Sequence, residues 1–195
     1  MILSDNELNS QNLEEFEELL HMYKSLKVST FIEIGSLYGW ALRHFIYYSQ
    51  QKSLGISIDL PVRNFVGPHD RRVIEQERRY KEEWPKWAKE RECKLYLLPT
   101  SSLIPSTKLK VDEILNDRKI DFIFIDGDHR YEAIKNDFLT FSPLVRKGGM
   151  IAFHDIGLNE EGGGNVFWNE IKSQYKYTEI LKDENKEKGI GVLEL

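Results

Sequence analysis

The 195-residue chain lacks most of the features that mark extracellular, membrane or nucleic-acid-binding proteins. Its one cysteine, Cys93, cannot form a disulfide within the chain, and no apolar run approaches the roughly 20 residues of a membrane-spanning helix. The first residues do not form a basic segment followed by an apolar one, as a secretory leader does. With 27 basic and 32 acidic residues, no broad positive surface is expected. We therefore expect a cytoplasmic protein that binds neither membranes nor nucleic acid.

Strand-like and helix-like segments alternate along almost the whole chain. Apolar runs of strand length occupy residues 28–34, 54–60, 94–98, 121–125, 150–153, 177–181 and 190–195. Helical spacing of apolar residues lies between them, and the last two runs read as a hairpin. The pattern predicts an α/β fold: a Rossmann-like, doubly wound, mostly parallel seven-stranded sheet with a C-terminal antiparallel hairpin.

No repeat, low-complexity tract or linker divides the chain, so residues 1–195 are expected to form a single domain with residues 1–27 as an N-terminal helical extension. Within the charged segment 61–93, Pro85 is expected to break or kink a helix. A connecting helix is predicted over 109–115. Pro143 and the glycine pair at 148–149 are expected to end the helix that begins near Tyr131 before the next strand starts.

Two of the apolar runs stop abruptly at acidic and imidazole side chains. Residues 121–138 read DFIFIDGDHRYEAIKNDF, and residues 148–156 read GGMIAFHDI. Parallel strands deliver functional groups at their carboxyl ends, so both stretches predict a site at one edge of the sheet. The candidates that follow from this pattern are Asp126, Asp128, His129, His154 and Asp155.

A second signal lies in the first strand and its turn, FIEIGSLYGW, which contains Glu33, Gly35 and Gly39. Glycines before a helix allow a ligand to approach the backbone closely, although a turn that needs glycine only for its geometry would look the same. Asp59 strengthens the ligand interpretation. It follows Gly39 by 20 residues, about the spacing at which an acid meets a ribose hydroxyl.

Two cofactors fit such a turn. A nicotinamide dinucleotide favours three glycines around its pyrophosphate, but Leu37 stands where the middle glycine would be. S-adenosylmethionine has no phosphate and carries a sulfonium cation, so it tolerates a looser loop and suits acidic neighbours such as Glu33 and Asp126.

These stretches together carry a family resemblance. The turn Glu33-Ile34-Gly35 with Gly39, the acid Asp59 and the terminal GIGVLEL resemble class I S-adenosylmethionine-dependent methyltransferases. The pair IDGDHRYEAIKNDF and GGMIAFHDI resembles the small O-methyltransferases of the macrocin type and their cephalosporin-biosynthesis-like relatives.

The resemblance implies a role for each candidate. Glu33, Gly35, Ser36 and Gly39 would surround the methionine part of the cofactor, and Asp59 would hold its ribose. The acid that usually follows the third strand has no counterpart in LPTSS, so Thr100 or Ser101 would stand in for it beside the adenine. Asp126 would lie beside the cofactor and would also be a metal ligand.

At the reaction end, the resemblance implies that Asp126, His154 and Asp155 hold a divalent metal, Mg²⁺ or Mn²⁺. Histidine replaces an acid at position 154, which either shifts the preference toward a nitrogen-tolerant metal or weakens the site. His129 would be the general base, because a neutral imidazole accepts a hydroxyl proton near neutral pH. Asp128 would orient His129 or the acceptor. The alternatives are that both residues only stabilise the start of the next helix.

The expected activity is therefore O-methylation of a hydroxyl on a small molecule, such as a sugar or glycosylated metabolite. The glycine-rich segment 160–168 is a candidate acceptor loop or a plain connector. A metal-independent N- or C-methyltransferase, or a nicotinamide-binding or non-catalytic module, stays open, as does assembly into a homo-oligomer.

Overall fold

The computed structural model describes residues 12–61, 64, 71–157, 163–182 and 188–195. The predicted loop around Gly67 and Pro68, residues 160–162 of the candidate acceptor loop, and most of the turn at 183–189 lie outside the described residues.

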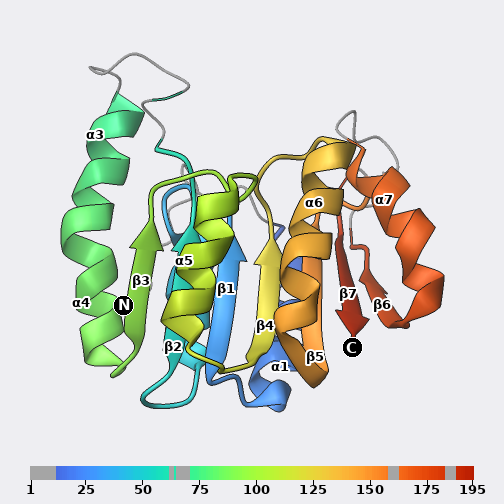
Figure 1. Ribbon diagram of the computed structural model, residues 1–195, viewed down its shortest axis with the longest axis horizontal. Helices are drawn as coiled ribbons and strands as arrows, with labels where there is room; N and C mark the ends of the chain where they lie inside the picture. The colour runs from blue at the N-terminus through green and yellow to red at the C-terminus, as the bar shows by residue number, and fades with distance from the viewer. Residues whose placement is uncertain (1–11, 62–63, 65–70, 158–162, 183–187) are drawn as a thin grey trace.

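Seven strands form one twisted sheet in the order β3-β2-β1-β4-β5-β7-β6 (Figure 1). Their bounds are β1 Thr30–Ile34, β2 Leu54–Ile58, β3 Lys94–Leu98, β4 Ile120–Ile125, β5 Val145–His154, β6 Lys176–Ile180 and β7 Ile190–Glu194. Strands β1 to β5 pair in parallel, whereas β7 runs antiparallel to both of its neighbours. The predicted Rossmann-like sheet with its antiparallel C-terminal strand is confirmed. The strand order reverses between β1 and β4, which is where open α/β sheets bind ligands.

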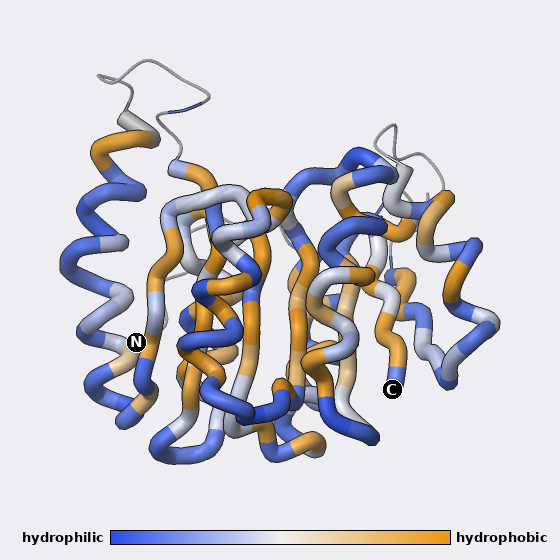
Figure 2. The backbone as a smooth tube through the Cα atoms, viewed as in Figure 1, coloured by the Kyte–Doolittle hydropathy of each residue, from blue (hydrophilic) through white to orange (hydrophobic). Residues whose placement is uncertain are grey.

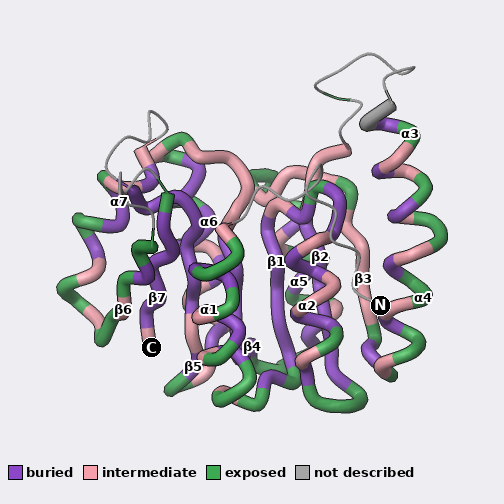
Figure 3. The backbone as a smooth tube through the Cα atoms, turned by 180° about the vertical axis from the view of Figure 1, so that it is seen from behind, coloured by how far each residue is buried: buried purple, intermediate pink, exposed green. Residues whose placement is uncertain are grey.

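Helices cover both faces of this sheet (Figures 1 and 3). Helices α1 Leu13–Leu26, α2 Trp40–Tyr48 and α4 Trp84–Glu90 share a core with one face, and α5 Pro105–Leu115, α6 Tyr131–Phe141 and α7 Gly164–Ile171 share a core with the other. Two short 3₁₀ turns, η3 Ser142–Leu144 and η4 Lys172–Gln174, follow α6 and α7. No helix in the described ranges is long and apolar enough to cross a membrane.

The central strands are apolar on both sides because each side meets a layer of helices. In β4, Phe122 and Phe124 pack with α1 and α2, while Ile123 and Ile125 pack with α5 and α6. Side chains alternate across a strand, so a strand buried on both faces reads as a continuous apolar run. Figure 2 shows this as apolar central strands beside helices of mixed hydropathy. Because burial on both faces gives an unbroken apolar run, the central strands are the easiest elements to predict from the sequence.

The segment around Pro85 stays helical, so of the two expected outcomes, a break or a kink, the break does not occur. Helix α3 Arg71–Arg78 passes into the π-helical turn η2 Arg79–Glu83 and then into α4. The Trp84 amide donates to the Arg79 carbonyl, which is the longer bond of a π-helix. Proline has no amide hydrogen and its ring crowds the preceding turn, and the wider π turn accommodates both constraints.

Two other boundaries differ from the prediction. Helix α5 begins at Pro105 rather than near Leu109, because proline is well suited to the first helical turn. Gly148 and Gly149 lie inside β5 and do not end α6. Gly148 has a φ of +71° and its amide donates to the Leu195 carbonyl, where the register of β5 against β4 shifts. The glycines therefore form an irregularity within the strand.

The Asp121 carboxylate lies at the amino ends of the parallel strands, where it joins the starts of β1, β4 and β5. Its Oδ2 accepts hydrogen bonds from the Ser29 amide, the Ser29 hydroxyl and the Thr30 amide, and its Oδ1 accepts from Arg146 Nε at 2.5 Å. Burial alone would raise the pKa of Asp121, but Arg146 and these donors together lower it. The ionised carboxylate therefore stabilises the native sheet.

We expect Asp121→Asn to lower the free energy of unfolding by about 1.5–3 kcal/mol at pH 7, the range for hydrogen bonds to a charged group. A lowered native pKa means that this contribution is present above the unfolded pKa of about 3.9 and is lost as the pH falls through the native pKa. Urea unfolding should thus show a difference between variant and wild type that narrows in acid. Asp112→Asn, which removes an exposed pair with Lys108, is the control and should change little. If the difference in unfolding free energy between Asp121→Asn and the wild type did not change with pH, the stabilising role of the ionised Asp121 carboxylate would be contradicted.

Candidate functional site

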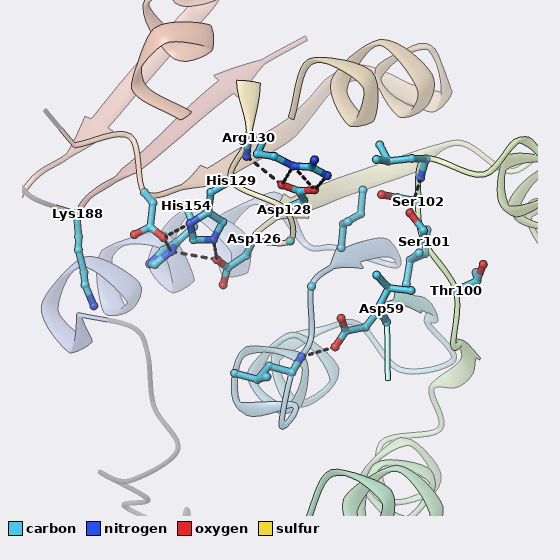
Figure 4. Close-up of a pocket in the computed structure, with 18 residues that line it drawn as sticks. Asp59, Thr100, Ser101, Ser102, Asp126, Asp128, His129, Arg130, His154 and Lys188 are labelled. Carbon is cyan, nitrogen blue, oxygen red and sulfur yellow. Dashed lines mark hydrogen bonds and ion pairs between the residues drawn. The ribbon is translucent and has the colours of Figure 1, made fainter. Parts of the chain in front are cut away.

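A cavity of about 740 Å³ opens at the carboxyl ends of the parallel strands, across the point where the strand order reverses. The cavity wall includes eight predicted site residues: Gly35, Asp59, Ser101, Asp126, Asp128, His129, His154 and Asp155. Figure 4 shows Asp59, Thr100 and Ser101 on one side and Asp126, His129 and His154 on the other. The cofactor and reaction ends predicted from separate motifs therefore share one cavity.

The loop after β1 is shaped by its contact with the loop after β4. Gly35 has a φ of +89°, and a Cβ there would lie 2.1 Å from the Asp126 carbonyl oxygen. The Asp126 amide in turn donates to the Ile34 carbonyl at 2.8 Å. Glycine is needed at position 35 both for its backbone conformation and for this close approach.

Glu33, Ser36 and Gly39, predicted to contact the cofactor, do not line the cavity. The side chains of Glu33, at the end of β1, and Ser36, in the loop, are buried. The Ser36 hydroxyl donates to Glu33 and lies 2.7 Å from the Ser57 hydroxyl. Glu33 Oε1 has no hydrogen-bond partner among the described residues. Burial raises the pKa of Glu33 well above its usual value, and Asp126 and Asp59 raise it further.

Asp59, predicted to hold the ribose, lies on the cavity wall. Its Oδ2 accepts a hydrogen bond from the Leu37 amide at 2.6 Å. Burial raises the pKa of Asp59 to about 6, against backbone hydrogen bonds from Leu37 and Leu60 that lower it. Thr100 and Ser101, the residues proposed to replace the missing acid, line the wall after β3. This end of the cavity thus offers a carboxylate and hydroxyls to a ligand.

At the other end, four side chains converge from the ends of β4 and β5. His154 Nδ1 lies 3.1 Å from Asp126 Oδ1 and 3.0 Å from Asp155 Oδ2. His129 Nδ1 lies 3.4 Å from Asp155 Oδ2, and its Nε2 lies 3.9 Å from Asp126 Oδ1. Figure 4 shows His129, His154 and Asp126 turned toward one another.

The two histidines differ in exposure. The His154 side chain is 3% exposed, whereas that of His129 is 43% exposed and reaches the cavity. Burial alone would lower the pKa of His154, but the Asp126 and Asp155 carboxylates raise it to about 10. His129 is therefore the histidine that an entering molecule can contact.

Asp128 is paired with Arg130. It holds the Arg130 guanidinium with both of its oxygens and accepts a hydrogen bond from the Arg130 amide at 3.0 Å. Arg130 precedes α6, and its guanidinium and amide lower the pKa of Asp128. These contacts favour the alternative in which Asp128 stabilises the start of the helix over the alternative in which it orients His129.

The donor set at the reaction end fits a divalent metal. One donor atom from each of Asp126, His154 and Asp155 lies within 4.8 Å of the others. Neither ring nitrogen of His154 makes a well-formed hydrogen bond within the described chain, and Asp155 Oδ1 has no partner there. Buried polar atoms without partners are expected where an ion would satisfy them. Two carboxylates and an imidazole suit Mn²⁺ or another nitrogen-tolerant metal better than Mg²⁺.

Several wall residues were not among the sequence candidates. Leu37 was noted only as a missing glycine, yet it lines the cavity and has a φ of +48°. Arg130 and Lys188 also line the wall. Lys188 comes from the segment before β7. Burial alone would raise the pKa of Asp155, but His154, His129 and Lys188 together lower it. A lone lysine beside a charged turn carries no sequence signal for such a position.

Comparison with known protein families decides the broad class of the protein. A family described as "Methyltransferase domain" matches residues 32–156, from β1 through the end of β5. The chain belongs to this methyltransferase family. The match includes the loop after β1, Asp59 and the whole cluster around Asp126, so both predicted ends of the site fall within it.

Several solved structures with the same fold are methyltransferases of low sequence identity to this chain. The enzyme from Bacillus cereus, solved with S-adenosylhomocysteine, has a TM-score of 0.63 at 14% identity, covering 97% of this chain and 85% of that one. TomG from Streptomyces achromogenes, solved with S-adenosylmethionine, has a TM-score of 0.62 at 11% identity, with 97% and 82% coverage. The calicheamicin methyltransferase CalS11 has a TM-score of 0.63 at 16% identity, with 94% and 80% coverage. These similarities confirm the predicted methyltransferase fold.

Two curated sequences match over shorter stretches. Protein R132 of Acanthamoeba polyphaga mimivirus is 53% identical over 36 residues, and protein y4gI of Sinorhizobium fredii is 29% identical over 72 residues. The first match covers 18% of this methyltransferase and 16% of the relative, and the second covers 36% and 8%. The chain therefore spans only a small part of either relative.

Proposed function

We propose that this methyltransferase transfers the methyl group of S-adenosylmethionine to a hydroxyl of a small molecule, such as a sugar or glycosylated metabolite. In this proposal His129 is the general base, and a divalent metal binds at Asp126, His154 and Asp155. The observation that carries the proposal is the exposed His129 imidazole, 3.4 Å from Asp155, in the same cavity as Asp59. The complexes of the related folds with S-adenosylmethionine or S-adenosylhomocysteine support the choice of cofactor.

The cofactor would lie along the loop after β1, with Asp59 accepting hydrogen bonds from the ribose hydroxyls and Thr100 and Ser101 beside the adenine. Bound S-adenosylmethionine supplies an electrophilic methyl group: the acceptor oxygen forms a bond to that carbon as the carbon–sulfur bond breaks, leaving S-adenosylhomocysteine. The wall contributed by Asp126, His129 and Asp155 then faces the acceptor.

His129 takes the hydroxyl proton in this scheme. Its Nδ1 faces the Asp155 carboxylate, so the tautomer protonated at Nδ1 leaves Nε2 as the proton acceptor. Asp155 stabilises the imidazolium that results. Asp126, His154 and Asp155 would hold the metal, which when bound lowers the pKa of a coordinated hydroxyl. The general base and the metal ligands share one carboxylate, which keeps the acceptor oxygen and its proton acceptor close together.

The first test is ligand binding followed by thermal unfolding. S-adenosylhomocysteine at 100 times its Kd should stabilise the native protein by about 2.7 kcal/mol and raise Tm, whereas NAD should not. Stabilisation by NAD alone would overturn the proposed cofactor and restore the nicotinamide-binding alternative. No effect of either ligand would favour a non-catalytic module.

The metal is tested with the full chain by calorimetric titration of Mn²⁺ and Mg²⁺ after treatment with a chelator. We expect Mn²⁺ to bind more tightly than Mg²⁺, because one ligand is an imidazole. Asp126→Asn should abolish binding, and Asp128→Asn is the matched control because its carboxylate is paired with Arg130. Absence of Mn²⁺ binding to the wild type, together with methyl transfer that survives chelation, would establish a metal-independent enzyme.

His129→Gln should lower kcat about 10²–10⁴-fold with hydroxyl acceptors, the usual contribution of a general base. Its affinity for S-adenosylhomocysteine should stay near that of the wild type, since the base faces the acceptor. His21→Gln, on the exposed surface of α1, is the control. Wild-type turnover by His129→Gln across the pH range would show that the histidine only stabilises the loop before α6.

A further inference from the structure

Leu37 holds an unusual backbone conformation in the loop after β1. Its φ of +48° lies in the left-handed region, which is unfavourable for L-residues other than glycine because the Cβ crowds the backbone. Both of its backbone polar groups are held from outside the loop. The amide donates to Asp59 Oδ2 at 2.6 Å, and the carbonyl accepts from Gln76 Nε2 at 2.9 Å.

Gln76 reaches this carbonyl from α3, which belongs to the helical run between β2 and β3. The residue is 7% exposed, although most of α3 is strongly polar. Between this helical run and the ends of β2 and β3 lies a second cavity of about 190 Å³, lined by Gln76, Tyr80 and Trp84 on one side and by Asp59 and Leu60 on the other. Gln76 therefore borders this second cavity, and its amide donates to the Leu37 carbonyl in the neighbouring loop.

The same helical run supports the end of the loop. Trp84, 1% exposed, lies so close to Gly39 that a Cβ there would be 2.3 Å from the indole Nε1. Gly39 has a φ of +77°, and its amide donates to the Ser36 carbonyl at 2.6 Å. The run from α3 to α4 thus contacts the loop at two points, by a hydrogen bond at Leu37 and by packing at Gly39.

We propose that Gln76 is a positioning residue for the cofactor: it fixes the Leu37 peptide in the left-handed conformation, and through the Leu37 amide it sets the orientation of the Asp59 carboxylate. The inference rests on the proposed binding of S-adenosylmethionine at Asp59. In this chain leucine occupies the place of a glycine, so the loop needs an external hydrogen bond to keep a conformation that glycine would adopt without strain. Gln76 does not itself line the main cavity.

The test measures the Kd of S-adenosylhomocysteine by calorimetry for Gln76→Met and Gln76→Glu. Methionine keeps the length and volume of the side chain without the donor, and glutamate keeps the shape but places an acceptor against the Leu37 carbonyl. Loss of one hydrogen bond of about 1.4 kcal/mol predicts about ten-fold weaker binding for Gln76→Met. Gln76→Glu should bind S-adenosylhomocysteine no more tightly than Gln76→Met does. Gln174→Met, at an exposed position far along the chain, is the matched control.

A double-mutant cycle separates positioning from general packing. In a Leu37→Gly background the left-handed conformation carries no strain, so the effect of Gln76→Met on the Kd should shrink from about ten-fold to about two- or three-fold. Equal effects in both backgrounds, or wild-type affinity in Gln76→Met, would overturn the role of Gln76 while leaving the proposed function intact. Failure of the wild type to bind S-adenosylhomocysteine would instead overturn the proposed function, and this inference with it.

Discussion

The close approach of the loops after β1 and β4 is the constraint on which the site depends. Position 35 has no room for a side chain, because a Cβ would meet the Asp126 carbonyl at 2.1 Å. The contact brings the loop expected to hold the cofactor against the strand end that carries Asp126. His154 and Asp155 follow from β5, the next strand of the sheet. A substitution at Gly35 would therefore disturb both ends of the cavity.

The reaction end is built from groups whose charges compensate one another. His154 lies between Asp126 and Asp155, and Asp155 is shared with His129. Next to this cluster, Asp128 forms an ion pair with Arg130 at the start of α6. The burial of His154 and the exposure of His129 divide the cluster into an inner group suited to a metal and an outer group suited to an acceptor.

Much of the fold was predictable because buried parallel strands leave a strong signal. Residues such as Phe122 and Ile123 are apolar on opposite faces, so β4 stands out as an unbroken run. A helix break at Pro85 and an end to α6 at Gly148 and Gly149 were expected, and neither occurs. A π-helical turn and a strand irregularity depend on hydrogen bonds to the Arg79 and Leu195 carbonyls, and composition does not specify such partners.

The sequence alone determined the sheet and the candidate residues at its carboxyl edge, because strand ends and the residue types that carry chemistry are local properties. It could not determine the partners of those residues. Asp128 pairs with Arg130, the side chains of Glu33 and Ser36 are buried against each other, and Gln76 and Lys188 reach the site region from distant segments. Only the tertiary structure decides such contacts, since they join residues that are far apart in the chain or compete for the same partner.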